Sequence, residues 1–282
     1  MKNNQNRCQI SIALTSELIK CQPNIIELLA DFQQVCLPSI GLEYTLLHHS
    51  DYVPITDVIA NTTLSFTKVF SASWQQLADV ASQSNFDLIL SSQVELFSLL
   101  QGLNLACVVL KNVESRTSKV ESQMSDDKRR RSNVETKLKE NTNGADRQLH
   151  FTFDGDGVLF NHGIQLDDSV DSIEAFEQFE TNNADKPMNQ AVLFNFISKV
   201  DTVAKQCPQV SWSLVTARGP NALPRAVNTL SHWQLNPAGV YFLSGQDKTP
   251  ILRGLNSSLF FDDHPSHCER ARPYINVGQV LI

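Results

Sequence analysis

The stretch FTFDGDGVLF, residues 151–160, places two carboxylates two residues apart between two apolar runs. Asp154 and Asp156 would share one face of an extended segment. Unpaired like charges at the end of a buried strand are costly, so such a pair normally needs a cation or a proton between its members. Taken alone, the stretch also fits a turn rich in Asp and Gly between two strands. The other strand ends of the chain decide between these interpretations.

Short apolar runs and helical patterns alternate on both sides of this stretch. In the N-terminal part we expect strands at 10–14, 43–47, 86–90 and 106–110, and helices at 25–35, 74–81 and 94–100. In the C-terminal part we expect strands at 149–153, 210–215, 240–243 and 259–261, and helices at 172–179, 190–204, 222–233, 250–255 and 266–271. The alternation predicts an α/β fold: a parallel sheet with flanking helices, plus an N-terminal α/β unit.

The two parts are separated by a stretch of different composition. Residues 111–147 carry ten Lys/Arg and seven Asp/Glu and almost no large apolar residues. We interpret this stretch as a charged, disordered connector between a unit at 1–110 and a domain at 148–282. Its basic run KRRR, residues 128–131, is flanked by Asp126 and Asp127, which favours a solvated loop over a nucleic-acid patch.

Composition limits the class of protein. The 282 residues are 41% hydrophobic and 19% charged, which is ordinary for a globular protein, and the net charge of -7 gives no reason to expect a nucleic-acid partner. The six cysteines form no CxxC pair and are interpreted as reduced thiols. No run reaches membrane-spanning length, and Glu17 and Lys20 interrupt the first apolar segment too early for a signal peptide. We therefore expect a cytoplasmic protein without a membrane partner, and leave open whether it forms a homo-oligomer.

Polar groups follow four successive strands of the C-terminal part. The strands end at Asp154, at Thr216, shortly before Lys248, and at Asp262 and Asp263. Active groups of parallel sheets collect at the carboxyl ends of strands. Each group alone has an ordinary structural explanation, but together they suit Mg²⁺, which prefers oxygen ligands, and a phosphate held by a hydroxyl and an ammonium. The sequence therefore predicts phosphoryl transfer at this edge, with one Asp free to attack phosphorus.

The same segments resemble a known family. FDGDGVLF, LVTARG, LSGQDKTPIL and FFDDHPSH resemble the four motifs of the haloacid-dehalogenase-like (HAD-like) phosphatases. More narrowly, DKPMNQAVLFNFI and LVTARGPNALPRAVNTLSHWQLNPAGVYFLSGQDKTPIL are similar to the cytosolic 5'-nucleotidases of type I. The resemblance covers residues 148–282, while GLEYTLLHHSD and FDLILSSQVELFSLLQGLNLACVVL look like diverged versions of that family's N-terminal half. It implies a HAD-like Rossmannoid sheet.

The resemblance also implies a reaction, the Mg²⁺-dependent hydrolysis of AMP-like nucleoside 5'-monophosphates. Asp154 would attack phosphorus to give an aspartyl phosphate, and Asp156 would protonate the leaving oxygen and then activate water. Thr216, Lys248 and Arg218 would bind the phosphate.

The metal would lie between Asp154, the main-chain carbonyl of Asp156, and one or both of Asp262 and Asp263. His264 and His267 could instead form a zinc site, but the sequence indicates no third soft ligand, which favours Mg²⁺.

Several alternatives stay open. The substrate could be another small phosphate ester, such as a sugar phosphate, or the chain could be a non-catalytic regulatory protein that senses a nucleotide. His48 and His49 could contact a ligand, although a loop is favoured. Phe160, Phe176 and residues 161–168 are candidates for base recognition, but the sequence does not assign a base.

Overall fold

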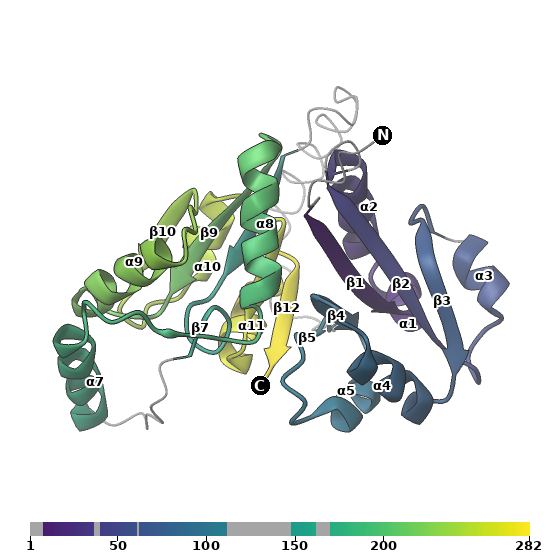
Figure 1. The fold of residues 1–282 in the computed structure, drawn as a ribbon, viewed down its shortest axis with the longest axis horizontal. Coiled ribbons are helices and arrows are strands. Elements are labelled where there is room, and N and C mark those ends of the chain that lie inside the picture. The colour runs from purple at the N-terminus through teal and green to yellow at the C-terminus, as the bar shows by residue number, and fades with distance from the viewer. Residues whose placement is uncertain (1–7, 37–39, 61, 112–147, 162–169) are drawn as a thin grey trace, which may run out of the picture.

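The structure, a computed structural model, describes residues 8–36, 40–60, 62–111, 148–161 and 170–282. One ten-stranded sheet runs through both halves of the chain in the order β10-β9-β6-β11-β12-β5-β4-β1-β2-β3 (Figure 1). Helices flank it, so the expected α/β class is confirmed. The charged stretch lies outside the described residues except for Lys111, and the candidate segment 161–168 does so except for Asn161. The division of the chain into units at 111–147 stays a prediction.

The N-terminal half contains all the strands and helices expected there, and three further elements. Its elements are β1 (Gln9–Thr15), α1 (Ser16–Cys21), α2 (Pro23–Cys36), β2 (Gly41–His49), α3 (Ile55–Ala60), β3 (Phe66–Ala72), α4 (Trp74–Gln83), β4 (Leu88–Ser91), α5 (Val94–Leu100) and β5 (Cys107–Val109). The prediction missed α1 and α3, which have six residues each, and β3, an edge strand with no fully buried residue. Such segments have too little apolar periodicity to stand out.

The C-terminal half likewise contains the expected elements. They are β6 (Leu149–Phe153), β7 (Phe160–Asn161), α7 (Val170–Asn182), β8 (Asn189–Gln190), α8 (Phe194–Gln206), β9 (Val210–Thr216), the 3₁₀ turn η2 (Pro220–Ala222), α9 (Leu223–His232), β10 (Gly239–Phe242), α10 (Thr249–Gly254), β11 (Leu259–Asp262), α11 (Pro265–Ala271) and β12 (Val277–Leu281). The helix predicted from residue 190 begins at Phe194, because Asn189–Gln190 pairs with β7 instead. The prediction also missed β12.

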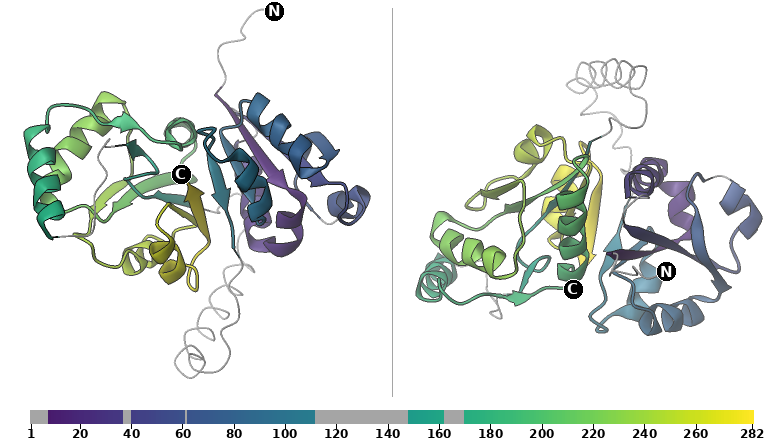
Figure 2. Two further views of the ribbon diagram at one scale, coloured as in Figure 1. Left: turned by 90° about the horizontal axis from the view of Figure 1, so that it is seen from below. Right: turned by 45° about the horizontal axis from the view of Figure 1, so that its top comes forward.

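The pairing of β12 with β5 joins the two halves (Figure 2). It is the one antiparallel pair of the ten-stranded sheet as described, with Leu281 opposite Cys107 and Gln279 opposite Val109. Because β5 runs against β12, the turn that enters β5 lies beside the carboxyl end of β12. A turn of the N-terminal half is thereby placed at the edge where the predicted active groups collect.

The halves also share one hydrophobic core. Phe32 of α2 packs edge-on against Phe151 of β6, with ring centroids 5.3 Å apart, inside a cluster of buried residues from both halves. A partly exposed ion pair adds a polar contact: Lys199 Nζ of α8 lies 2.7 Å from the buried Asp87, which also accepts a hydrogen bond from the Ser11 amide. Burial of large aromatic side chains across the junction stabilises the sheet as one layer.

The side chains expected to be reduced thiols are free cysteines, and Cys36, Cys107, Cys207 and Cys268 are buried. His48 and His49 are the last two residues of β2 and do not lie in a loop; His48 is buried and His49 packs against Trp74. Within the described ranges, no helix combines the length and the apolar character needed to cross a membrane.

We predict that Gly278→Ala destabilises the protein by about 1–3 kcal/mol, because the core at this position has no room for a methyl group. A Cβ there would lie 2.5 Å from Val108 Cγ1, and the stiff, buried valine cannot move aside easily. The matched control is Gly254→Ala at the end of α10, where nothing lies within 4 Å, and it should leave stability unchanged or slightly higher. Urea unfolding followed by circular dichroism measures both. Equal stability of the two variants would contradict the tight contact between β12 and β5.

Candidate active site

The predicted polar groups converge at one edge of the sheet. Asp154 follows β6 and Asp262 ends β11, and these strands are neighbours in register, with Phe153 opposite Phe261. The Asp154 amide donates to the Phe261 carbonyl at 2.8 Å, which fixes the start of the turn after β6. Both carboxylates are buried. The prediction that these strand ends meet is confirmed.

The turn after Asp154 requires glycine. Gly157 has a φ of +73°, a left-handed conformation that glycine adopts without steric cost. A Cβ at this position would also lie 2.5 Å from Asp263 Oδ2, so the backbone passes directly over that carboxylate. The turn closes through hydrogen bonds from the Leu159 and Phe160 amides to the Gly155 carbonyl. Asp156 is thereby held at the rim of the site, half-buried.

Lys248 lies at the centre of the acidic cluster. Its Nζ is 2.7 Å from Asp154 Oδ1 and 2.7 Å from Asp262 Oδ2, and its side chain is only 2% exposed. Burial alone would lower the pKa of Lys248, but the two carboxylates outweigh burial and raise it. The ammonium therefore stays charged and holds the ends of β6 and β11 together.

One ammonium does not compensate all the negative charge around it. Burial raises the pKa of Asp154 well above its ordinary value, and although Lys248 opposes this, Asp262 adds to it. Burial, assisted by Asp262, also raises the pKa of Asp263 to about 6. The pKa of Asp262 is lowered, because hydrogen bonds from His267 and the charge of Lys248 outweigh burial. Burial and neighbouring carboxylates thus disfavour the charged forms of Asp154 and Asp263, and a divalent cation with oxygen ligands would favour those forms.

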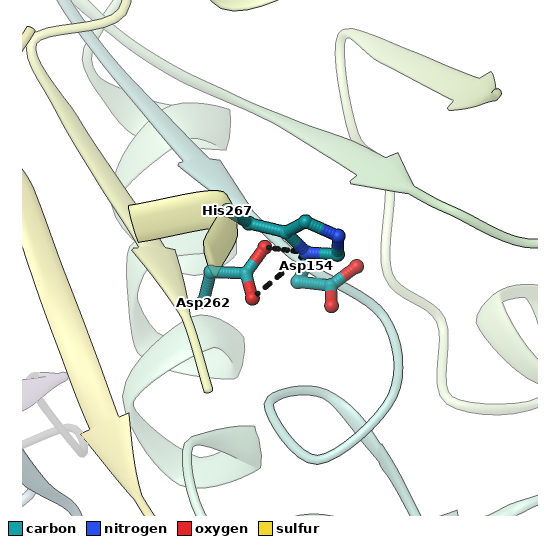
Figure 3. Close-up of side chains that lie close together, drawn as sticks. All are labelled: Asp154, Asp262 and His267. Atoms are coloured by element: carbon teal, nitrogen blue, oxygen red, sulfur yellow. Dashed lines mark hydrogen bonds and ion pairs between the residues drawn. The ribbon is translucent and has the colours of Figure 1, made fainter. Parts of the chain in front are cut away.

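His267 adds a nitrogen to this cluster (Figure 3). Its Nδ1 lies 3.1 Å from Asp262 Oδ2, and ligand atoms of Asp154, Asp262 and His267 all lie within 4.8 Å of one another. His264 takes a different role, since its Nδ1 accepts a hydrogen bond from the Ser266 amide and caps α11. The two histidines therefore do not act as a pair, and the cluster contains two carboxylates for one imidazole, which favours a hard cation over zinc.

Thr216 ends β9 and Arg218 follows it two residues later, on the side of β6 away from β11. The buried Thr216 hydroxyl accepts a hydrogen bond from the Arg218 amide at 3.2 Å, which leaves its own hydrogen for another acceptor. Thr216 also lies against the turn, with Oγ1 3.1 Å from where a Gly155 Cβ would be. This placement suits a donor to a phosphate oxygen near Asp154.

Arg218 points to carboxylates. It binds Asp156 through two nitrogens, Nε at 2.8 Å from Oδ2 and Nη2 at 2.6 Å from Oδ1, and donates from Nη1 to Glu180. Burial alone would lower the pKa of Arg218, but both carboxylates raise it. The phosphate-binding role expected for Arg218 stays a prediction; the observed contacts are those of a clamp on Asp156.

Two further residues complete this clamp, and the sequence did not indicate either. Glu180 of α7 is fully buried, and its second oxygen accepts a hydrogen bond from Arg225 Nη1 of α9 at 2.7 Å. The candidate aromatics lie here as well: the Arg218 guanidinium stacks over Phe160 and Phe176 at 5.5 and 5.1 Å. A chain of four buried or half-buried charges thus links α7 and α9 to Asp156.

We predict that Glu180→Ala lowers the free energy of unfolding by about 3–5 kcal/mol, because it removes the buried carboxylate that Arg218 and Arg225 share and leaves Arg218 with Asp156 alone. The matched control is Glu177→Ala on the same helix, whose carboxylate makes a solvent-exposed hydrogen bond to Asn221 Nδ2; this change should cost about 1 kcal/mol or less. Chemical denaturation of both variants provides the measurement. A similar small cost for both would show that the buried charge chain does not hold α7 in place.

A cavity of about 700 Å³ opens next to the site, and Asp156 and Asp263 form part of its wall. Its opposite wall belongs to α5 and to the turn before β5. Phe160 and Asn161, two of the candidates for base recognition, also line it.

Comparison with known proteins agrees with this geometry. A family model described as 5'-nucleotidase matches residues 118–282. The human protein named cytosolic 5'-nucleotidase 1B is 34% identical over 138 residues, a match that covers 45% of this chain and 22% of the human protein. The matched part of this chain therefore spans only about a fifth of the length of that relative.

Proposed function

Because this chain belongs to the 5'-nucleotidase family, we propose that it hydrolyses AMP-like nucleoside 5'-monophosphates in a Mg²⁺-dependent reaction that passes through an aspartyl phosphate. The observation that carries the proposal is the position of Lys248 Nζ, 2.7 Å from both Asp154 and Asp262 at the edge where Thr216 also ends its strand. A carboxylate, an ammonium and a hydroxyl at the same edge of the sheet suit phosphoryl transfer, which depends on positioning and on stabilisation of charge.

In the first half-reaction, an Asp154 carboxylate oxygen attacks phosphorus and the bond from phosphorus to the ribose 5'-oxygen breaks. Asp156 gives its proton to that departing oxygen, which leaves as the nucleoside hydroxyl. Arg218 holds Asp156 in position through two hydrogen bonds, and each carboxylate oxygen keeps a second lone pair for the proton transfer. The Thr216 hydroxyl and the Lys248 ammonium stabilise the phosphoryl oxygens.

In the second half-reaction, Asp156 takes a proton from water while the water oxygen attacks phosphorus. The bond from phosphorus to Asp154 breaks, and inorganic phosphate and the free Asp154 carboxylate result. The same pair of residues therefore serves both halves. Their spacing of two residues, with Asp156 in the turn that left-handed Gly157 shapes, places both carboxylates at the end of the same strand.

The side chains of Asp154, Asp262 and Asp263 and the main-chain carbonyl of Asp156 would hold the Mg²⁺. The closeness of Asp154 to Asp262 and the position of Asp263 against the backbone of Gly157 support this set. When bound, the cation supplies charge neutralisation for the phosphoryl oxygens.

The alternative of a non-catalytic sensor has less support, because Asp154, Asp156, Thr216 and Lys248 are all present and lie at one edge. The human relative is named a cytosolic 5'-nucleotidase, and we propose a cytoplasmic location for this chain. The alternative that the substrate is another small phosphate ester predicts faster hydrolysis of that ester than of any nucleotide.

We predict release of inorganic phosphate from AMP in the presence of Mg²⁺, loss of activity with EDTA, and recovery with added Mg²⁺. A panel of nucleoside monophosphates and sugar phosphates, assayed for phosphate with and without metal, provides the measurement. Faster hydrolysis of a sugar phosphate than of any nucleotide would overturn the substrate assignment. Recovery with Zn²⁺ and not with Mg²⁺ would overturn the metal assignment.

A further inference from the structure

The cavity beside Asp156 lies between the two halves of the chain. On one side, Asp156, Asp263 and Phe160 belong to the active-site edge. On the other side are Val94, Phe97 and Ser98 of α5 and Gln101 and Asn104 of the following turn. The C-terminal half alone therefore cannot form this cavity.

The part of the cavity wall that comes from the N-terminal half is held in place by packing of α5 and by the backbone of the turn that follows it. Leu96, Phe97 and Leu100 anchor α5 in the core, and the Ser98 hydroxyl donates to the Val94 carbonyl one turn earlier, so both residues lie on the same side of the helix. The turn after α5 is set by two left-handed residues, Gly102 with a φ of 82° and Asn104 with a φ of 51°. Asparagine tolerates this conformation better than most residues.

The reversed pairing of β5 with β12 brings this wall to the active edge. Cys107, the first residue of β5, lies opposite Leu281 near the end of β12, and both line the cavity. A parallel pairing would have placed the turn before β5 at the opposite edge of the sheet, away from Asp156.

The reaction determines what this space must hold. In an in-line displacement the leaving oxygen lies opposite the nucleophile and within reach of the acid that protonates it. The alcohol part of the substrate must then continue into the space on the side of Asp156, and the cavity bounded by Asp156 is such a space. Its volume of about 700 Å³ lies in the range of small-molecule sites.

The lining suits an uncharged nucleoside. Amides of Gln101, Asn104 and Gln190 line the cavity and could bond to the edge of a base and to ribose hydroxyls, while Phe97 and other apolar groups offer surfaces to its faces. In the part of the chain that the structure describes, two carboxylates but no Lys or Arg line the cavity. A second phosphate group would be unfavourable there.

We infer that this cavity binds the nucleoside of the substrate and that α5 with the turn 101–105 forms its specificity-determining wall. The inference rests on the proposed function and adds to it that the N-terminal half selects the leaving group.

The test fills the cavity from α5. Ser98→Phe places a ring into the cavity, and the matched control Leu99→Phe changes the neighbouring residue, which is 41% exposed and does not line the cavity. AMP is compared with acetyl phosphate, whose leaving group is too small to reach the far wall. We expect Ser98→Phe to lower kcat/KM for AMP at least ~10-fold and to change kcat/KM for acetyl phosphate less than ~2-fold, with both unchanged in Leu99→Phe.

A second variant tests the same cavity in case Ser98→Phe does not fold. Asn104→Gly removes the amide and keeps the left-handed backbone, and should raise KM for AMP up to ~10-fold through loss of hydrogen bonds, with acetyl phosphate unaffected. Its control is Leu103→Ala on the same turn, 49% exposed and outside the cavity.

The outcomes separate the two claims. If Ser98→Phe and Asn104→Gly leave AMP hydrolysis unchanged, or reduce both substrates equally, the cavity does not hold the nucleoside and the inference is wrong. If the wild-type protein hydrolyses acetyl phosphate but no nucleotide, the proposed function itself is wrong.

Discussion

The ammonium of Lys248 between Asp154 and Asp262 is the contact on which the site depends. Two buried carboxylates at adjacent strand ends would repel each other and resist desolvation, and the single Lys lets β6 and β11 end side by side with both groups inside the protein. The compensation is partial, which leaves Asp154 short of positive charge. This arrangement is the basis for the proposal that a divalent cation binds beside Asp154, and such a cation would add the positive charge that a phosphate needs.

Two other features build outward from this contact. Arg218, which contacts Glu180 of α7 and through it Arg225 of α9, holds Asp156, so Asp154 and Asp156, the proposed nucleophile and proton-transferring residue, each contact a separate cation. The antiparallel pairing of β5 with β12 then brings a turn of the N-terminal half to the same edge. In this account the C-terminal half supplies the proposed catalytic residues and the N-terminal half supplies the proposed substrate-binding wall. Because Phe32 and Phe151 pack in one core shared by both halves, the position of the wall relative to the catalytic residues depends on that packing.

Most of the candidate site could be predicted from the sequence, because Asp154, Thr216, Lys248 and Asp262 each follow an apolar run, and the family resemblance is confirmed by the match over residues 118–282. Glu180 and Arg225 could not, since single charged residues in amphipathic helices look like surface positions until a partner is known. The contacts of Arg218 depend on that same pairing. The strand β12 was not predicted, and its antiparallel pairing with β5 could not be, because long-range contacts that no local pattern specifies decide which strands pair and in which direction.

The most direct test is a search for the phosphoryl group on Asp154. Wild-type, Asp154→Asn and Asp156→Asn proteins are mixed with AMP and Mg²⁺, quenched in acid and digested, and the peptide that contains residues 148–186 is analysed by mass spectrometry. We expect one added phosphoryl group, located on Asp154, in the wild-type protein and none in Asp154→Asn; with acetyl phosphate, whose leaving group needs no protonation, Asp156→Asn should also be labelled. Hydrolysis of AMP by Asp154→Asn at the wild-type rate would contradict covalent catalysis by this residue.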